Sequence, residues 1–317
     1  MKKVIDKLKM GGSYILLPHV NMDGDALGSC LALYEIITAL GGSARIVAEE
    51  KVSFTLSFLA EKIEIYSEDE NYKCDCAVAV DCGDLKRLGK RSVIFENAAH
   101  TVCIDHHMTN EGGFADAAVV EPDAAATGEI VYDIAKEAGI NIEGKAADYI
   151  YTAIVSDTGG FRYSNTTEKT LNIAASLVSG GVDSAKICTL LFDNKKLSQA
   201  RLEAAVINSA SFLAGGAFAI VCVSEKMLEE CGAEYEDADA LSAILRGISG
   251  VLVAAVIKEK EGGLKLSMRS ENVDISGVCT SLGGGGHRFA AGASSTGAME
   301  DFCDKVIELT MPLLEKD

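Results

Sequence analysis

Residues 14–42 read YILLPHVNMDGDALGSCLALYEIITALGG, a compact apolar run followed by a polar segment and a helical pattern. The run at residues 14–18 has the length and composition of a buried strand. Residues 25–40 repeat apolar side chains at helical spacing, Asp25 stands at the expected N-cap, and Gly41 follows the last periodic residue. We therefore predict a strand, a loop and a helix in direct succession.

The same alternation continues through the first 190 residues. Further strands are expected at residues 76–80 and 101–104, and further helices at residues 127–138, 145–155 and 167–178. Strands that alternate with helices favour an α/β fold, here a doubly wound and mainly parallel sheet with helices on both faces.

A different pattern follows a polar segment around residues 190–198. In order, we expect a helix at 202–213, a strand from Ala217, a helix at 238–248, strands at 251–258 and 264–269, a helix, a glycine-rich loop, and a final helix at 299–314. This order predicts a smaller α+β domain. We divide the chain into a first domain (1–190), a linker with a connecting helix (191–214) and a second domain (215–317), with the active site expected in the cleft between the domains.

The charge balance limits the partners of this chain. Its 317 residues include 29 basic and 47 acidic side chains, which give a formal net charge of −18. Proteins that follow long nucleic acids need a basic surface, so a large nucleic-acid footprint is not expected. No apolar run approaches the roughly 20 residues that span a bilayer, and the first ten residues lack the apolar core of a signal peptide. We expect a soluble cytoplasmic protein without a membrane partner.

The ten cysteines are interpreted as reduced and structural, because several lie in apolar strand-like or helix-like segments. A zinc site at Cys74, Cys76 and Cys82 is a minority interpretation, since no second pair at finger-like spacing follows.

Acidic and imidazole side chains gather after the expected strands and at the end of one helix. They are His19, Asp23, Asp25, Asp81, Asp105, His106, His107 and Asp157. Each alone is more typical of a turn, an N-cap or a structural histidine. Carboxyl ends of parallel strands converge on one crevice, however, and so many acids together need cations. Two divalent metal ions would satisfy them and could promote phosphoryl displacement. The mixed ligand set suits Mn²⁺, with iron, cobalt or zinc as competitors.

These segments, in this order, resemble the four motifs of the DHH phosphoesterase superfamily. The resemblance implies that His19, Asp23 and Asp81 hold one manganese ion. It further implies that Asp25, Asp81, His106 and Asp157 hold the second, with Asp81 bridging. By the same resemblance, Asp105 would orient the ligand shell from behind, and His107 would face the substrate phosphate as a catalytic residue.

The second domain contains the sequence SLGGGGHRFAAG at residues 281–292. A run of glycines alone is often a mobile linker. This one resembles the glycine-rich motif of the DHH-associated C-terminal domain, which binds the nucleotide part of the substrate. The resemblance assigns substrate contacts to Arg269, Gly284, Gly285, Gly286, His287 and Arg288. Arg162, after the fourth motif, is a weaker candidate.

Among relatives, the chain is most similar to the stand-alone nanoRNase/pAp phosphatase group. Their substrates are short oligoribonucleotides, and they often dephosphorylate 3′-phosphoadenosine 5′-phosphate. Three alternatives stay open: a cyclic dinucleotide phosphodiesterase, a family II inorganic pyrophosphatase, and a non-catalytic nucleotide-sensing protein. Relatives are often homodimers, and the sequence leaves the oligomeric state open.

Overall fold

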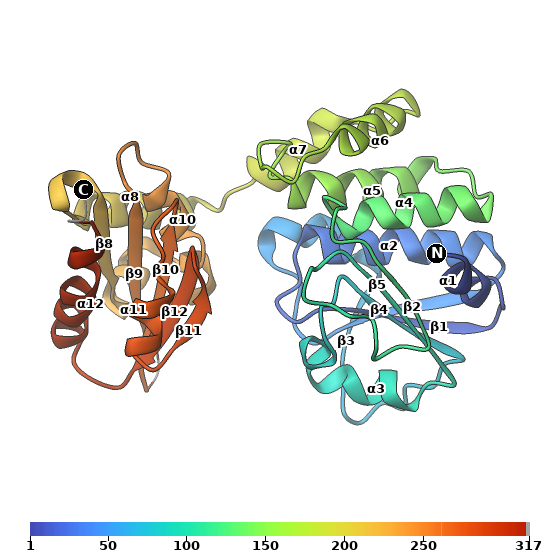
Figure 1. Cartoon of the computed structure of the whole chain (residues 1–317), viewed down its shortest axis with the longest axis horizontal. Helices are drawn as coiled ribbons and strands as arrows, with labels where there is room; N and C mark the ends of the chain where they lie inside the picture. The colour runs from blue at the N-terminus through green and yellow to red at the C-terminus, as the bar shows by residue number, and fades with distance from the viewer. Residues whose placement is uncertain (261, 315–317) are drawn as a thin grey trace. The chain divides into compact units, whose positions relative to one another are not determined.

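The computed structural model describes residues 1–260 and 262–314, which belong to two compact units. The first unit is Met1–Asn194, and the second begins at Lys195. Figure 1 shows that each unit consists of a sheet with helices against it. Helix α8 (Leu197–Ser209), which falls in the segment expected to connect the domains, contributes buried side chains to the second unit.

A six-stranded parallel sheet forms the centre of the first unit. Its strands are β1 (Ser13–Pro18), β2 (Ser43–Ala48), β3 (Ile63–Ile65), β4 (Cys76–Val80), β5 (His100–Asp105) and β6 (Ala117–Val120). Their spatial order is β3-β2-β1-β4-β5-β6, so the order reverses between β1 and β4. This confirms the predicted doubly wound sheet. In such sheets ligands bind beyond the carboxyl ends of the strands at the reversal.

Helices cover both faces of this sheet (Figure 1). One face carries α2 (Gly24–Ala39), α4 (Thr127–Ala138) and α5 (Gly144–Asp157). The opposite face carries α3 (Ser92–Asn97) and the 3-10 helix η2 (Leu85–Arg91). The remaining helices of this unit are α1 (Lys2–Leu8), η1 (Phe54–Lys62), α6 (Glu168–Ser179) and α7 (Ser184–Phe192).

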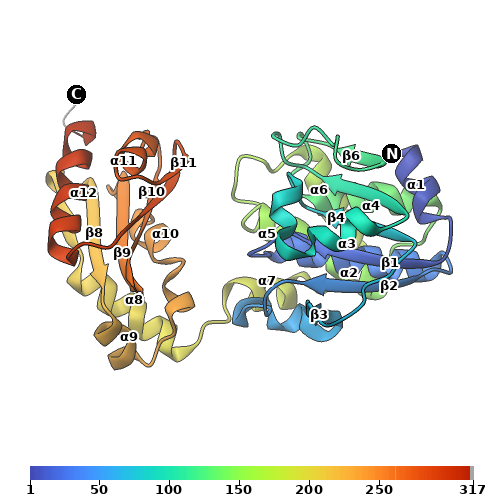
Figure 2. The same cartoon turned by 90° about the horizontal axis from the view of Figure 1, so that it is seen from below.

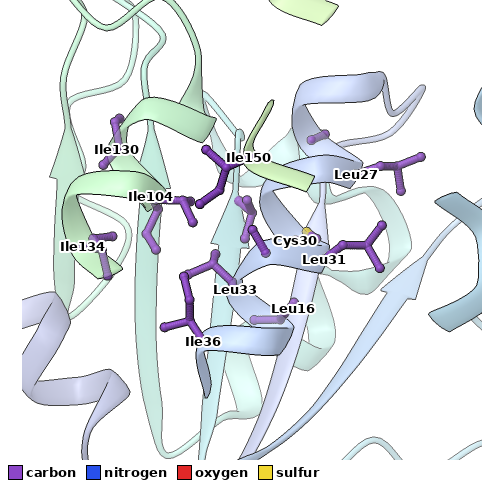
Figure 3. Close-up of a cluster of buried hydrophobic side chains, with 14 of the residues drawn as sticks. Leu16, Leu27, Cys30, Leu31, Leu33, Ile36, Ile104, Ile130, Ile134 and Ile150 are labelled. Carbon is purple, nitrogen blue, oxygen red and sulfur yellow. The ribbon is translucent and has the colours of Figure 1, made fainter. Parts of the chain in front are cut away.

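The central strands are apolar throughout because both of their faces are buried. Leu16 of β1 and Ile104 of β5 lie in one cluster with side chains of α2, α4 and α5, among them Ile150 (Figure 3). The neighbouring Ile15 joins the cluster on the opposite face, together with Phe95 of α3. Successive strand side chains point to opposite faces, so one short strand serves two cores.

The N-cap of helix α2 lies two residues earlier than the sequence predicted. The N-cap is Asp23 rather than Asp25, and its carboxylate accepts hydrogen bonds from the N–H groups of Asp25 and Ala26, both at 3.0 Å. Asp25 lies inside the first turn, where its buried side chain serves the acidic cluster described below. The expectation failed because two aspartates stand two residues apart, and either satisfies the N-cap preference.

Two glycines bring the beginnings of α2 and α4 close to α5. A Cβ at Gly28 would lie 2.7 Å from the carbonyl oxygen of Tyr149, and one at Gly128 would lie 2.6 Å from the Cβ of Ala153. Side chains at either position would therefore push the helices apart. The close crossing matters because Asp25 lies one turn before Gly28, and Asp157 lies one turn after Ala153.

A mixed six-stranded sheet forms the second unit, in the order β11-β12-β10-β9-β8-β7. Its strands are β7 (Ser211–Leu213), β8 (Phe218–Val223), β9 (Val253–Lys260), β10 (Gly263–Ser270), β11 (Gly285–His287) and β12 (Ala290–Ser295). Helices α11 (Ser276–Ser281) and α12 (Met299–Leu314) cover one face, and α12 lies along β8 in Figure 2. Helix α8 covers the other face with α9 (Glu225–Cys231) and α10 (Leu241–Arg246). The predicted α+β unit is confirmed.

Two local predictions in this unit were wrong. The helix expected at 202–213 ends at Ser209, because residues 211–213 pair with β8 as an edge strand. The glycine-rich segment is not simply a loop, since Gly285–His287 pairs with β12. In both places the segment pairs as a hairpin with the strand that follows it along the chain, and helical or apolar periodicity does not report such pairing.

All ten cysteines are free thiols, as expected. None of the three candidate ligand groups found within residues 1–260 and 262–314 contains a cysteine, so the zinc interpretation has no support there. Over the same residues no single helix has the length and apolar composition to cross a bilayer, although α6 and α7 pass that test together as a sharply bent pair.

Candidate metal centre

The predicted acids and imidazoles meet at the carboxyl end of the first sheet. His19 follows β1, Asp81 follows β4, and Asp105 ends β5, directly before His106 and His107. Asp81 has a φ of +57°, a left-handed conformation that turns the chain sharply as it leaves the sheet. Since β1, β4 and β5 are neighbours, these side chains converge where the strand order reverses.

Asp81 lies at the centre of the cluster and is only 2% exposed. Its Oδ2 is 3.5 Å from the Nε2 of His19, and its Oδ1 is 3.6 Å from the Nε2 of His106. The His19 Nε2 also lies 3.7 Å from the Oδ2 of Asp23. Asp81 therefore contacts imidazoles on both sides, as a bridging ligand would.

A second group forms around His106. Its Nε2 lies 3.8 Å from the Oδ2 of Asp25 and 3.7 Å from the Oδ2 of Asp157. The side chains form three sets, and within each set the ligand atoms lie within 4.8 Å of one another. Two sets have Asp81 in common, and two have His106 in common. The sets are His19–Asp23–Asp81, Asp81–His106–His107 and Asp25–His106–Asp157.

Hydrogen bonds to main-chain carbonyls orient two of the imidazoles. The Nδ1 of His19 contacts the carbonyl oxygen of Val20 at 2.8 Å, and the Nδ1 of His106 contacts that of Ala124 at 3.1 Å. Each contact places a ring proton on Nδ1 and directs Nε2 at the carboxylates, so that loss of the Nε2 proton leaves the Nδ1–H tautomer. This tautomer is the one that a metal-binding histidine requires.

Asp105 and His107 form a separate pair beside the cluster. The fully buried Asp105 accepts hydrogen bonds from the Nδ1 of His107 and the Nδ2 of Asn110, both at 2.7 Å. Burial alone would raise the pKa of Asp105, but these two donors outweigh it and lower the pKa. The same hydrogen bond raises the pKa of His107, whose side chain is 41% exposed. The Asp105–His107 hydrogen bond thus holds an imidazole at the exposed side of the site.

The N-terminus of α4 supplies donors to two acids. The N–H groups of Thr127 and Gly128 donate to the carboxylate of Asp25 at 2.7 and 3.0 Å. The Thr127 hydroxyl donates to the Oδ1 of Asp81 at 2.8 Å. A helix N-terminus carries partial positive charge, so it stabilises anions placed there.

These donors do not neutralise the cluster. Burial and the charges of Asp81 and Asp157 raise the pKa of Asp25 well above its usual range. Burial and neighbouring carboxylates also raise the pKa of Asp157 to about 6, against the opposing effect of His106. Burial lowers the pKa of His19, but its contacts with Asp23 and Asp81 prevail and raise the pKa to about 10. The site favours added positive charge, which protons or metal ions can supply.

The structure brings all eight predicted residues of the first domain together. It does so through side chains that sequence reasoning missed. Thr127 begins a helix that the sequence did predict, so a donor there was foreseeable, whereas Asn110 lies in an irregular loop without a signal. Glu50 is a third case, because its carboxylate accepts from the N–H groups of Asn21 and Met22, in the loop between His19 and Asp23.

The predicted substrate residues of the second unit lie on and beside its sheet. Arg269 and His287 flank Ala290 in register on neighbouring strands. Side chains in register across a sheet share a face, and two strand spacings put these residues about 10 Å apart. Arg288 pairs with Asp274 at 3.1 Å. Gly284, Gly285 and Gly286 are exposed beside them.

Two family models match the chain. The model described as the DHH family, N-terminal domain, matches residues 13–154, and the DHHA1 domain matches residues 217–311. These ranges fall within the first and second units, respectively.

Similar proteins match along most of the chain. A bifunctional oligoribonuclease and PAP phosphatase NrnA from Thermus thermophilus is 34% identical, over 97% of this chain and 92% of its own length. The protein of the same name from Bacillus subtilis is 31% identical over 92% of each chain. An exopolyphosphatase-related protein from Bacteroides fragilis has a similar structure, with a TM-score of 0.90, 24% identity, and coverage of 100% of this chain and 98% of the other. This last similarity concerns the fold alone.

Proposed function

The chain belongs to the DHH family of phosphoesterases, and from this membership we propose that it hydrolyses short oligoribonucleotides to mononucleotides and dephosphorylates 3′-phosphoadenosine 5′-phosphate. The names of the relatives support these two substrates over cyclic dinucleotides and pyrophosphate. One structural observation carries it: three sets of ligand atoms overlap at the carboxyl end of the sheet, with Asp81 common to two of them and His106 common to two. Such an arrangement suits a pair of divalent ions, the usual agents of phosphoester hydrolysis.

We further propose that two Mn²⁺ ions occupy this centre. His19, Asp23 and Asp81 would hold one ion. The other would be held by Asp25, Asp81, His106 and Asp157. Imidazole nitrogens mixed with carboxylate oxygens fit a first-row transition metal, and the outward Nε2 atoms of His19 and His106 are ready for coordination. Bound ions would activate a water molecule and neutralise phosphate charge.

His107 is proposed as the catalytic residue that meets the substrate. Asp105 holds its Nδ1, so its Nε2 is free to donate a hydrogen bond to a phosphate oxygen or to the leaving oxygen. The hydrogen bond to Asp105 raises the pKa of His107, which favours the protonated ring that this donation needs. Asp105 itself is buried and would act only by positioning His107.

The second unit is proposed to bind the nucleotide part of the substrate through Arg269, His287 and Arg288, with backbone N–H groups of Gly284, Gly285 and Gly286. Arg269 and His287 share one face of the sheet, which supports a joint role. The acidic chain suits a substrate of few phosphates rather than a long strand. A cytoplasmic location and a homodimer stay predictions.

The decisive experiment compares several substrates with metal-stripped protein and added Mn²⁺. A linear diadenylate, 3′-phosphoadenosine 5′-phosphate, cyclic di-AMP and pyrophosphate would be incubated in parallel, and the products separated by chromatography. We expect rapid turnover of the first two substrates. Cleavage of pyrophosphate alone, or of none of the four, would refute the proposal.

Asp81→Asn tests the shared ligand. Loss of a group that merely orients a ligand costs about 10- to 100-fold, so loss of a ligand common to both ions should cost more than 100-fold in kcat. Asp69→Asn is the control, because it removes one negative charge in the same way at an exposed position, and it should retain full activity. Full activity of Asp81→Asn would disprove the bridging assignment.

A further inference from the structure

Two glycines follow Asp157, and each supports an aromatic ring. Gly159 and Gly160 have φ angles of +57° and +71°, so the chain makes a tight turn there. A Cβ at Gly159 would lie 2.4 Å from the Cζ of Tyr163, and one at Gly160 would lie 3.3 Å from the Cε2 of Phe192. The two rings therefore rest on the backbone of the turn.

Polar contacts fix this turn to the metal centre. The Nδ2 of Asn165 donates to the carbonyl oxygen of Asp157 at 3.1 Å, and the Nε of Arg162 donates to that of Gly159. The Arg162 guanidinium also lies 5.6 Å from the centre of the Phe192 ring, a cation–π distance. The aromatic and cationic groups are thus held in place before any substrate arrives.

Despite these supports, Tyr163 is 57% exposed and Phe192 is 37% exposed. One side of the Tyr163 ring is occupied by Gly159, which leaves the rest of the ring accessible. The Tyr163 Cζ lies within about 12 Å of the Asp157 Cα. This upper limit adds the two Cα–Cα steps of about 3.8 Å from Asp157 to Gly159, one Cα–Cβ bond at Gly159 and the 2.4 Å contact. A base attached to a phosphate in the metal centre falls within that range.

We propose that Tyr163, with Arg162 beside it, stacks against a nucleobase of the substrate and so helps to determine which phosphoesters bind. This inference rests on the proposed function. Exposed aromatic rings beside a cation are the usual platform for unpaired bases, because every base has a π face. The platform would therefore favour nucleotides over pyrophosphate without selecting a particular base.

Steady-state kinetics of Tyr163→Ala, Tyr163→Phe and Phe212→Ala test the role. Phe212 is 43% exposed on an edge strand of the second unit, so it is a control for loss of an exposed ring. We expect Tyr163→Ala to raise KM for the diadenylate about 5- to 150-fold with little change in kcat. Tyr163→Phe, which keeps the ring, and Phe212→Ala should match the wild type.

Diadenylates that lack one base separate stacking from a structural effect. If Tyr163 stacks on a base, the wild type and Tyr163→Ala should share one KM for the analogue without that base. An equal loss on the intact substrate and on both abasic analogues, or no loss at all, would overturn the proposal. Failure of the wild type to cleave any diadenylate would instead refute the proposed function, and the stacking role with it.

Discussion

Thr127 allows a direct test of how the candidate metal centre is organised, because its side chain can be changed without removing a proposed metal ligand. Its N–H donates to Asp25 and its hydroxyl donates to Asp81, and the residue is fully buried at the start of α4. Thr127→Val replaces the hydroxyl with a methyl group of similar shape. The variant keeps the main-chain contact and loses only the 2.8 Å hydrogen bond to the Asp81 Oδ1.

The size of the effect follows from the group that is lost. The Asp81 Oδ1 lies 3.6 Å from both the Nε2 of His106 and the Nδ1 of His107, so without Thr127 the carboxylate can turn toward either ring. A bound ion would then have to reorient it. Loss of hydrogen bonds that hold metal ligands weakens metal affinity about 10- to 100-fold, and we expect the Kd for Mn²⁺ to rise by that factor.

Isothermal titration of metal-stripped protein measures this change directly, and circular dichroism verifies the fold. Thr127→Ser keeps the hydroxyl and should bind Mn²⁺ like the wild type. High Mn²⁺ should restore most of the activity of Thr127→Val, because its ligands are intact. A wild-type Kd for Thr127→Val would show that the contact does not organise Asp81, and the reasoning would be wrong.

Three further predictions concern packing, the buried pair and pH. Gly28→Ala places a Cβ 2.7 Å from a carbonyl oxygen of α5 and should lower the free energy of unfolding by about 1–3 kcal/mol in urea titrations; an unchanged midpoint would contradict the close crossing. Asn110→Ala removes a donor to Asp105 and should cost about 1–3 kcal/mol in the same assay, whereas wild-type stability would show that the donor is dispensable. The folded pKa of His19, about 10, exceeds its ordinary value of 6.5, so its contribution to the stability of the metal-free protein is complete below pH 6.5 and is lost as the pH rises through 10. Denaturation at pH 7 and pH 10 measures this loss, and equal stability at both would count against the His19 contacts.

Much of the first unit was predictable because its strands are buried on both faces. The apolar runs at 14–18, 76–80 and 101–104 coincide with β1, β4 and β5, which are the three strands that position the candidate metal centre. Strands β2, β3 and β6 were not predicted. They lie toward the edges of the sheet and are less uniformly buried, so their sequences lack the continuous apolar signal of the centre.

The acids of the site could be identified from sequence, but their supporting contacts could not. Asp25 and Asp81 each follow a recognisable element, and the convergence of strand ends places them together. The N-cap was assigned wrongly to Asp25 because sequence preference does not distinguish a capping carboxylate from one that turns inward. Gly28 and Gly128 gave no signal either, since the need for a missing side chain appears only when α5 lies against them.

Protons and metal ions compete for the same side chains in the candidate metal centre, so metal binding there should depend on pH. Without ions, the raised pKa values of His19, Asp25 and Asp157 favour protons on the cluster, and bound metal ions would have to displace them. His107 differs, because in its proposed role it would donate only while it stays protonated. If the proposed metal centre and the proposed role of His107 hold, we expect lower pH to reduce activity by releasing metal and higher pH to reduce it by deprotonating His107. It follows that added Mn²⁺ should extend the active range toward acid while leaving the alkaline limit in place.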